Sequence, residues 1–202
     1  MSWVLSLQSL LGTGNYADDL FPDLYFGLEE LFTQTSFTTS QVEGCALAAA
    51  VASGNYNMWM TMYSLPYGGG GGGFFNNSNI NLVDRRAGVR AGALAAQSNV
   101  YYNLTDQYEP LKAIPDRLRD YMVYMTGGTS KIKFDSYMLA GHLVGPCNIC
   151  ITAYITVLKE QGYTLEQLSE IGRIASVIKA VSNIFPGYTP PPPVDNSNIG
   201  GA

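Results

Sequence analysis

Residues Gly145–Tyr154 have the sequence GPCNICITAY, which places two cysteines, Cys147 and Cys150, at the start of an amphipathic helix. Cysteines three positions apart on a helix share a face, so their sulfurs can be joined with little movement of the backbone. A thiolate at a helix N-terminus is stabilised by unpaired N–H groups and by the positive end of the helix dipole. The pair therefore indicates thiol redox chemistry or metal binding.

These cysteines lie within Ser136–Leu158, a stretch without Asp, Glu, Lys or Arg that is long enough to raise the question of a membrane span. Gly145 and Pro146 divide the stretch in half, and a proline in that position breaks a helix. We therefore expect two buried helices, over 131–144 and 147–161, that meet at a tight corner. Contact with a membrane is not expected.

Downstream of the corner, the sequence predicts one more helix and a tail. Gly162 ends the helix that contains the cysteines, and Thr164 and Gln167 have the spacing of a capping box, which opens a helix to about Phe185. Four successive prolines then exclude regular structure. Residues 187–202 are predicted to form an extended Pro-rich tail.

Upstream of the corner, helical patterns alternate with a loop. Ser40 and Glu43 have capping-box spacing, which predicts a helix over 41–53 whose small residues would let another helix pack closely. A second helix is predicted over 56–65. Six consecutive glycines then begin a Gly- and Asn-rich loop over 68–81, whose composition is typical of flexible segments.

Two more helices are predicted between this loop and the corner. Residues 85–108 have helical periodicity, and Pro115 suits the first position of a helix that continues over 116–125. The first of these helices has apolar residues spaced to line one face: Ala93, Ala96, Val100 and Leu104. The fold class is therefore all-α, with about eight helices in a single domain over 1–186.

Composition narrows the classes of partner. Charged residues make up only 13% of the 202 residues, about half the roughly 25% usual in soluble domains, so we expect a subunit of an oligomer or of a larger assembly. The net charge is −5, and no Lys, Arg or His precedes Arg85. An acidic chain without a basic stripe is not expected to bind nucleic acid. One CxxC with a single histidine falls short of a zinc site.

Two features bear on the compartment. Met1–Leu11 has neither the positive region of a secretory signal nor the Arg-rich character of a transit peptide. Three cysteines are too few for a disulfide scaffold, and Cys45, within CALAAAVAS, is expected in the core. We therefore expect a reducing compartment, either the cytoplasm or an organelle matrix.

From Ala91 to Phe185 the chain contains, in order, SNVYY, IPDRLR, KFDSYMLAGH, the CxxC helix and EQLSEIGRIASVIKAV. This order resembles the AhpD (alkyl hydroperoxide reductase D) group of the carboxymuconolactone decarboxylase superfamily, over about half of the chain. The resemblance implies an all-helical subunit that assembles as a trimer, without a cofactor. It also implies a thiol peroxidase or disulfide reductase that links a peroxiredoxin to lipoyl-type dithiols.

The family motif is a Glu, eleven intervening residues and C-x-x-C-x-x-x-H, often with a second His before the latter Cys. Cys147 and Cys150 match it, whereas Asp135 stands at the Glu position, Ile149 at the inner His position and Tyr154 at the final His position. In the family, Glu and His pass the proton that turns the second Cys into a thiolate. Asp is shorter, and Tyr, with an unperturbed pKa of about 10, is a poor base at neutral pH. The resemblance therefore implies reduced or altered activity.

His142, the only histidine, is a candidate replacement for the missing base. It lies seven residues after Asp135, on nearly the same helix face but about 10 Å along the axis. The alternative interpretation is a partly buried histidine satisfied by a backbone carbonyl. Tyr154 shares the face of both cysteines, and could either donate a hydrogen bond to a thiolate or serve packing.

Two functions remain open from the sequence. In the first, an AhpD-like thiol–disulfide oxidoreductase or peroxidase, Cys150 attacks a peroxide or accepts electrons, Cys147 resolves the product as a disulfide, and a dithiol partner restores both thiols. In the second, a catalytically inactive structural subunit, the cysteines are inert buried thiols and the helical fold serves docking in a larger complex.

Overall fold

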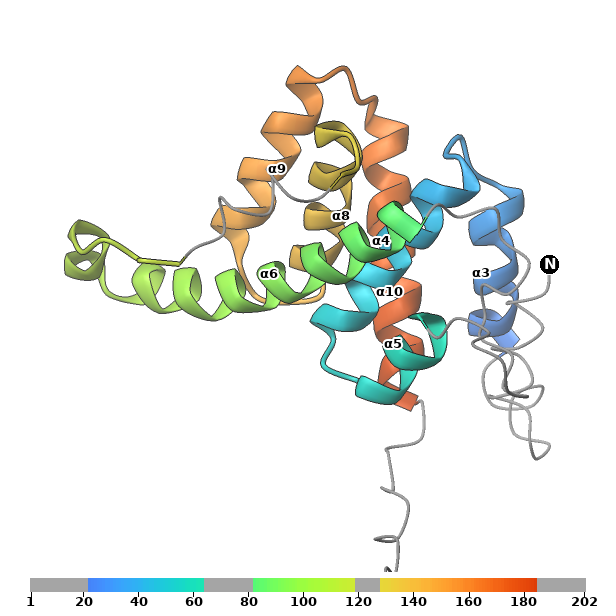
Figure 1. Ribbon diagram of the computed structural model, residues 1–202, viewed down its shortest axis with the longest axis horizontal. Coiled ribbons are helices and arrows are strands. Elements are labelled where there is room, and N and C mark those ends of the chain that lie inside the picture. Colours follow the sequence, from blue (N-terminus) through green and yellow to red (C-terminus); the bar gives the residue numbers. More distant parts are fainter. Residues whose placement is uncertain (1–21, 64–81, 119–127, 185–202) are drawn as a thin grey trace, which may run out of the picture.

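The computed structural model describes residues 22–63, 82–118 and 128–184, and all regular structure in these ranges is helical (Figure 1). This confirms the all-α prediction. The elements are α3 (Pro22–Thr33), α4 (Thr39–Ala52), α5 (Tyr56–Tyr63), α6 (Leu82–Gln107), the 3₁₀ helix η1 (Glu109–Ala113), α8 (Lys131–Leu143), α9 (Asn148–Glu160) and α10 (Leu165–Ile184). The Gly-rich loop over 68–81 and the tail over 187–202 lie outside the described residues, and the single domain over 1–186 stays a prediction.

Helix α4 has a different N-terminal cap from the predicted one. Thr38 is the N-cap: its hydroxyl accepts a hydrogen bond from the N–H of Gln41, whose side chain in turn accepts from the backbone of Thr38. The predicted box of Ser40 and Glu43 is therefore wrong, because both residues lie inside the helix. Tertiary contacts take their side chains instead, since Glu43 is buried and Ser40 donates to the carboxylate of Asp84 on α6.

The helices on either side of the corner follow the sequence prediction closely. Ser130 is the N-cap of α8, and α9 ends before Gly162, whose φ of 91° lies in the left-handed region that favours glycine. The predicted capping box at the start of α10 is present: Thr164 N–H donates to Gln167 Oε1 at 3.0 Å, and Gln167 N–H donates to Thr164 Oγ1 at 3.2 Å.

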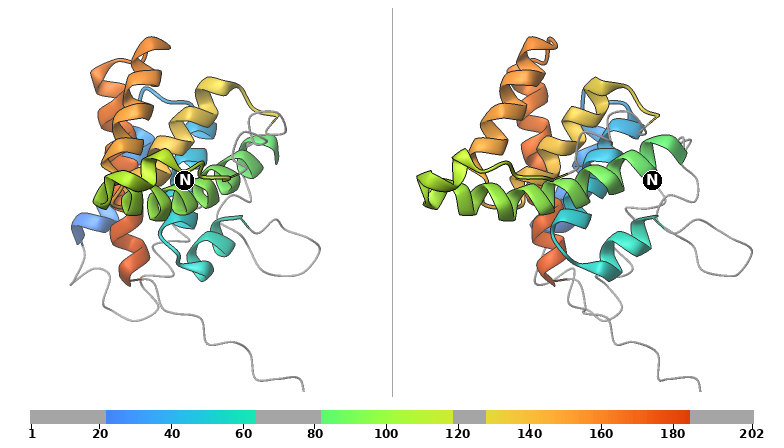
Figure 2. Two further views of the ribbon diagram at one scale, coloured as in Figure 1. Left: turned by 90° about the vertical axis from the view of Figure 1, so that its left-hand side faces the viewer. Right: turned by 60° about the vertical axis from the view of Figure 1, so that its left-hand side comes forward.

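Helix α6 is 26 residues long, and its C-terminal part projects beyond the other helices (Figures 1 and 2). Where α4 and α8 approach it closely, its buried residues are small, such as Ala91 and Ala95. The apolar face predicted from the spacing of residues faces solvent instead of the core. On this face Val100 is 75% exposed and Leu104 is 54% exposed.

The segment after α6 departs from the prediction. A short 3₁₀ helix, η1, follows α6, and residues 115–118 are not helical, so the helix expected from Pro115 is wrong over these residues. Asp116 instead accepts hydrogen bonds from the Tyr102 hydroxyl at 2.6 Å and from the N–H of Leu118 at 3.3 Å. Arg117 has a φ of 54°, which a continuing α-helix excludes. The rest of that prediction, over 119–125, lies outside the described residues.

The core is built on α4, α6 and α8, which meet through glycines. A Cβ added to Gly88 of α6 would lie 2.8 Å from the backbone oxygen of Gly44 on α4, and one added to Gly92 would overlap the backbone oxygen of Ala48. On α8, a Cβ at Gly141 would lie 2.7 Å from the side chain of Ala95. Backbones this close leave no room for larger residues, as the small-residue pattern of 41–53 predicted.

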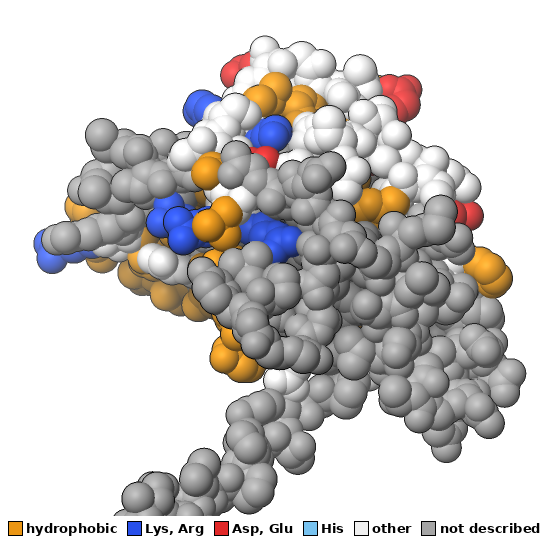
Figure 3. Space-filling view, turned by 45° about the vertical axis from the view of Figure 1, so that its right-hand side comes forward, with side chains coloured by type: hydrophobic (Ala, Val, Ile, Leu, Met, Phe, Trp, Pro, Cys, Tyr) orange, Lys and Arg blue, Asp and Glu red, His pale blue; other side chains and the backbone are white. Residues whose placement is uncertain are grey.

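Charged side chains are unevenly placed on one face of the described chain. On the face shown in Figure 3, basic side chains gather beside hydrophobic ones, whereas most of the remaining described surface is neither basic nor acidic. Asp84, by contrast, is buried: burial raises its pKa, but hydrogen bonds from Ser40, Thr129 and Lys133 outweigh this, so its net pKa is lowered. Among the helices of the described ranges, none is both long and apolar enough to cross a membrane.

The close approach of α4 and α6 can be tested with one methyl group. Gly92→Ala is expected to lower the free energy of unfolding by about 1–3 kcal/mol, because the new Cβ forces the two backbones apart. Gly172→Ala on α10 is the matched control, since a Cβ there meets nothing within 4 Å. It should instead raise stability by about 0.5–1 kcal/mol. Urea denaturation measures both, and a Gly92→Ala protein as stable as the wild type would refute the packing account.

Candidate active site

The two cysteines of the CxxC motif are joined in a disulfide. Their Cα atoms lie 5.3 Å apart, and the side chains of Cys147 and Cys150 are only 2% and 6% exposed. The inference that these sulfurs can meet is therefore correct, and an arrangement in separate pockets is excluded. The third cysteine, Cys45, is free and fully buried, and burial raises the pKa of its thiol to about 12, as expected for a core residue.

Cys147 also closes the N-terminal end of helix α9. It is the N-cap residue, and its Sγ accepts a hydrogen bond from the N–H of Cys150 at 3.3 Å. Its own N–H donates to the backbone oxygen of Gly145 at 3.1 Å. The helix end would stabilise a negative charge on this sulfur after reduction, and the thiolate expected from the sequence stays a prediction.

The corner between α8 and α9 packs against helix α6. A Cβ added to Gly145 would overlap the side-chain amide of Asn99, so only glycine allows this approach. The N–H of Gly145 donates to the backbone oxygen of His142 at 3.1 Å, which closes the end of α8. Asn99 itself is buried. The cysteines are thus held at a corner whose position is set by a side chain from a distant part of the sequence.

His142 is buried at this corner and hydrogen-bonds to a side chain rather than to a backbone carbonyl. Its side chain is 1% exposed, and its Nδ1 lies 2.8 Å from Oδ1 of Asn99. Burial lowers the pKa of His142 to about 4, so the ring is neutral at physiological pH. The sequence left open a hydrogen bond from His142 to a backbone carbonyl. For Nδ1 that alternative is wrong, because its partner is a side-chain oxygen.

Tyr154 of α9 contacts His142 of α8 through their rings. The two rings stack, with centroids 5.1 Å apart and planes at 28°. Tyr154 lies four residues after Cys150, so the two share a helix face about one turn apart. Of the residues predicted for the site, the structure pairs Cys147 with Cys150 and His142 with Tyr154, and their common role in catalysis stays a prediction.

Asp135 has its partners at the other end of α9. It is fully buried, and its Oδ2 accepts hydrogen bonds from Lys131 and, at 2.7 Å, from Gln161. Gln161 follows the last residue of α9, about 20 Å along the helix from the cysteines. These hydrogen bonds do not link Asp135 to the disulfide, and its part in a proton relay stays a prediction.

A hollow of about 450 Å³ lies beside the CxxC helix. Ile149, which stands between the two cysteines, forms part of its wall and is half exposed. The remaining walls come from α6, η1 and the segment that follows: Tyr101, Tyr102, Thr105, Leu111, Lys112, Ile114, Pro115 and Asp116. The hollow has no signal in the sequence, because it depends on the projecting end of α6 and on the unpredicted η1.

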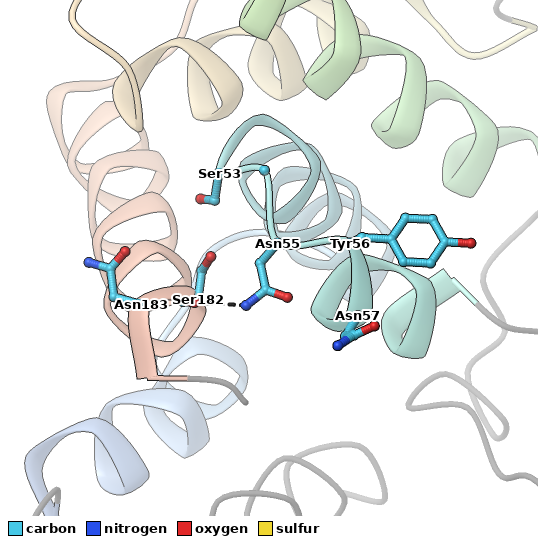
Figure 4. A pocket seen from close by; sticks show the side chains of 7 residues that line it. Ser53, Asn55, Tyr56, Asn57, Ser182 and Asn183 are labelled. Carbon is cyan, nitrogen blue, oxygen red and sulfur yellow. Dashed lines mark hydrogen bonds between the residues drawn. The ribbon is translucent and has the colours of Figure 1, made fainter. Parts of the chain in front are cut away.

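A second hollow, of about 410 Å³, is formed by the ends of α4 and α10 and the start of α5. Figure 4 shows that Asn55 spans it, donating from Nδ2 to the backbone oxygen of Ser182 at 2.8 Å. None of its lining residues comes from α8 or α9, so it is separate from the cysteines. Within the three described ranges, no group of three His, Cys, Asp or Glu side chains could hold a metal ion.

Comparison with known proteins finds relatives that are named alkyl hydroperoxide reductase AhpD. The chain is similar to the alkyl hydroperoxide reductase AhpD of Rhodospirillum centenum, with 29% identity over 169 residues, which are 83% of this chain and 85% of the relative. It is 26% identical to the protein of the same name from Hyphomonas neptunium, over 83% of this chain and 88% of the relative. The protein of that name from Solibacter usitatus is 26% identical, over 90% and 96%. No protein-family model matches the chain.

The neutral state of His142 predicts a pH dependence of stability. The pKa of His142 is about 4 in the folded chain and about 6.5 in the unfolded chain, so the unfolded chain binds more protons between these values. Stability is therefore full above about pH 6.5 and falls by about 3 kcal/mol as the pH drops towards 4. Urea unfolding at a series of pH values measures this slope. His142→Gln should flatten the slope over this window, and an unchanged slope in that variant would disprove the assignment.

Proposed function

The chain is an AhpD-like protein, and on that premise we propose that it is a thiol–disulfide oxidoreductase or peroxidase whose reacting groups are Cys147 and Cys150. The observation that carries this proposal is the disulfide at the N-terminus of a helix, with a histidine and a tyrosine over the same helix face. A pair of sulfurs that can be joined without rearranging the backbone can be opened and closed repeatedly.

In the reductive half of the proposed cycle, a dithiol partner opens the disulfide. One partner thiolate attacks Sγ of Cys150, forms a mixed disulfide and releases Cys147 as a thiolate, which takes up a proton. The second partner thiolate then displaces Cys150, which is protonated in turn. The partner's two thiols have become a disulfide, and both cysteines are reduced. Cys147 suits the leaving role because the end of α9 stabilises its negative charge.

In the oxidative half, Cys150 attacks a hydroperoxide. An S–O bond forms, the O–O bond breaks, and an alcohol leaves, so Cys150 becomes a sulfenic acid. Cys147 then attacks this sulfur, water leaves, and the disulfide is restored. The hollow beside Ile149 supports this proposal, because its walls are mostly aromatic and aliphatic and would accommodate the apolar body of an organic hydroperoxide. Asp135 and Tyr154 in place of the family's Glu and His support an altered or slower proton transfer.

The competing proposal is a structural subunit without catalysis. Two observations favour it: both sulfurs are almost fully buried, and helix α6 exposes apolar side chains. In this case the disulfide would serve only to hold the corner, and neither dithiols nor peroxides would reach it in the folded protein. The two proposals therefore differ in one measurable property, the accessibility of the disulfide to reductants under native conditions.

We also propose that the chain assembles with further copies of itself, through the outer face of α6. Val100 and Leu104 lie on the part of this helix that projects beyond the core, and Tyr108 and Ile114, directly after it, are similarly exposed. Burying these side chains against a second copy would remove apolar surface from water. The compartment and the physiological dithiol partner remain those expected from the sequence.

The redox proposal can be tested in a Cys45→Ser background, in which only the pair at the corner can react. A small dithiol should convert the folded protein to one with two alkylatable thiols, and cumene hydroperoxide should return it to none, as measured by mass spectrometry. Cys150→Ser should lower hydroperoxide consumption by about 100-fold or more, because the nucleophile is lost.

Circular dichroism during the reduction serves as the control, because it shows whether the chain stays folded. A disulfide that resists the dithiol until the chain is unfolded would rule out the enzyme and support the structural subunit.

The assembly proposal predicts that polar substitutions on α6 weaken self-association. Val100→Ser with Leu104→Ser should raise the dissociation constant by about 10-fold or more, measured by sedimentation equilibrium. Leu165→Ser is the matched control: Leu165 is 71% exposed but lies on α10. Equal dissociation constants for all three proteins would contradict the proposed interface.

A further inference from the structure

The hydrogen bond between Asn99 and His142 links two helices at the corner that holds the disulfide. Asn99 lies on α6 and His142 in the last turn of α8, and both side chains are buried. The 2.8 Å separation of His142 Nδ1 and Asn99 Oδ1 is that of a well-formed hydrogen bond. Nothing in the motif of cysteines, Glu and His accounts for this contact, because His142 and Asn99 both lie outside it.

This hydrogen bond determines which nitrogen of the imidazole carries the proton. An amide oxygen can only accept, so Nδ1 of His142 must be the donor. In a neutral ring the proton is then on Nδ1 and the lone pair is on Nε2. His142 is neutral because it is buried, so Nε2 carries a lone pair that can accept a proton.

The position of the ring is also restricted. His142 stacks on Tyr154, about one helical turn from Cys150 on the same face of α9. Gly145 packs so closely on Asn99 that the amide cannot move towards the corner. The imidazole is thus held between Asn99 of α6 and Tyr154 of α9, beside the helix face that carries Cys150.

We propose that Asn99 is a positioning residue, which holds His142 as the Nδ1-protonated tautomer so that Nε2 takes the proton of the Cys150 thiol. This inference rests on the proposed redox function. In the oxidative half, the thiol proton passes to Nε2 as sulfur attacks the peroxide, and then to the departing alkoxide, which leaves as the alcohol. The peroxide supplies the hydroxyl of the sulfenic acid, so all atoms are accounted for. Asn99 itself neither gains nor loses a proton.

Because His142 is the only histidine, nitrogen NMR can report its tautomer directly. In ¹⁵N-labelled protein at neutral pH, the long-range ¹H–¹⁵N spectrum should show a protonated Nδ1 and an unprotonated Nε2. Reducing the disulfide with a dithiol should shift the Nε2 resonance, because the Cys150 thiol then donates to it. These two measurements need no variant and so do not depend on a substitution being tolerated.

Three variants separate positioning from a merely structural role. Asn99→Leu removes the acceptor, so the fraction of His142 that is protonated on Nδ1 should fall. The single-turnover rate with cumene hydroperoxide should then fall at least about 10-fold. Asn99→Asp keeps an acceptor oxygen, so it should retain the tautomer and most of the rate. Ser98→Ala, at the neighbouring buried position of α6, should change neither quantity.

The outcomes distinguish this inference from the proposed function. If the wild type cycles between disulfide and dithiol but its proton lies on Nε2, or if Asn99→Leu reacts at the wild-type rate, the role of Asn99 is overturned and the redox function stands. If the wild type does not cycle at all, the proposed function fails. The positioning role of Asn99 in catalysis fails with it, even where the Nδ1 tautomer is observed.

Discussion

The close approach of α4, α6 and α8 is the constraint from which the rest of the structure follows. Gly88 and Gly92 bring the backbone of α6 against α4, and Gly141 brings α8 against α6. Short distances between helix axes leave room only for alanine and glycine in these contacts, which is why the buried face of α6 contains so few large side chains. The larger apolar residues of α6 consequently lie outside, where they are available to other surfaces.

The same contacts place α6 beneath the corner that joins α8 to α9. Once α8 is fixed on α6, Asn99 meets both Gly145 and His142, and these contacts hold the corner from which α9 starts. The polar groups that surround the cysteines therefore come from three helices, although the cysteines themselves belong to one. In the proposed cycle, the chemistry of the pair would therefore depend on a helix that contributes no sulfur and no charge to it.

Local features of the fold were predictable, whereas contacts between distant segments were not. Gly162 and the pairing of Thr164 with Gln167 act within a few residues, so their sequence pattern was sufficient. The cap of α4 was misassigned because Ser40 and Glu43 have tertiary partners that spacing does not reveal. For the candidate site, the cysteines could be found from the motif. Asn99 could not, since 43 residues separate it from His142.

Cys147 combines two tasks that proteins usually assign to different residues. Its sulfur is a member of the disulfide and also the acceptor that satisfies an N–H of the first turn of α9. Cys147 is only 2% exposed, so a bulky adduct on this sulfur, such as glutathione, would have to turn the side chain outward; the first turn would then lose its acceptor and fray. The first turn of α9 would then be helical only while the sulfur of Cys147 is unmodified. A partner that binds α9 could therefore distinguish the two states without contacting the sulfur.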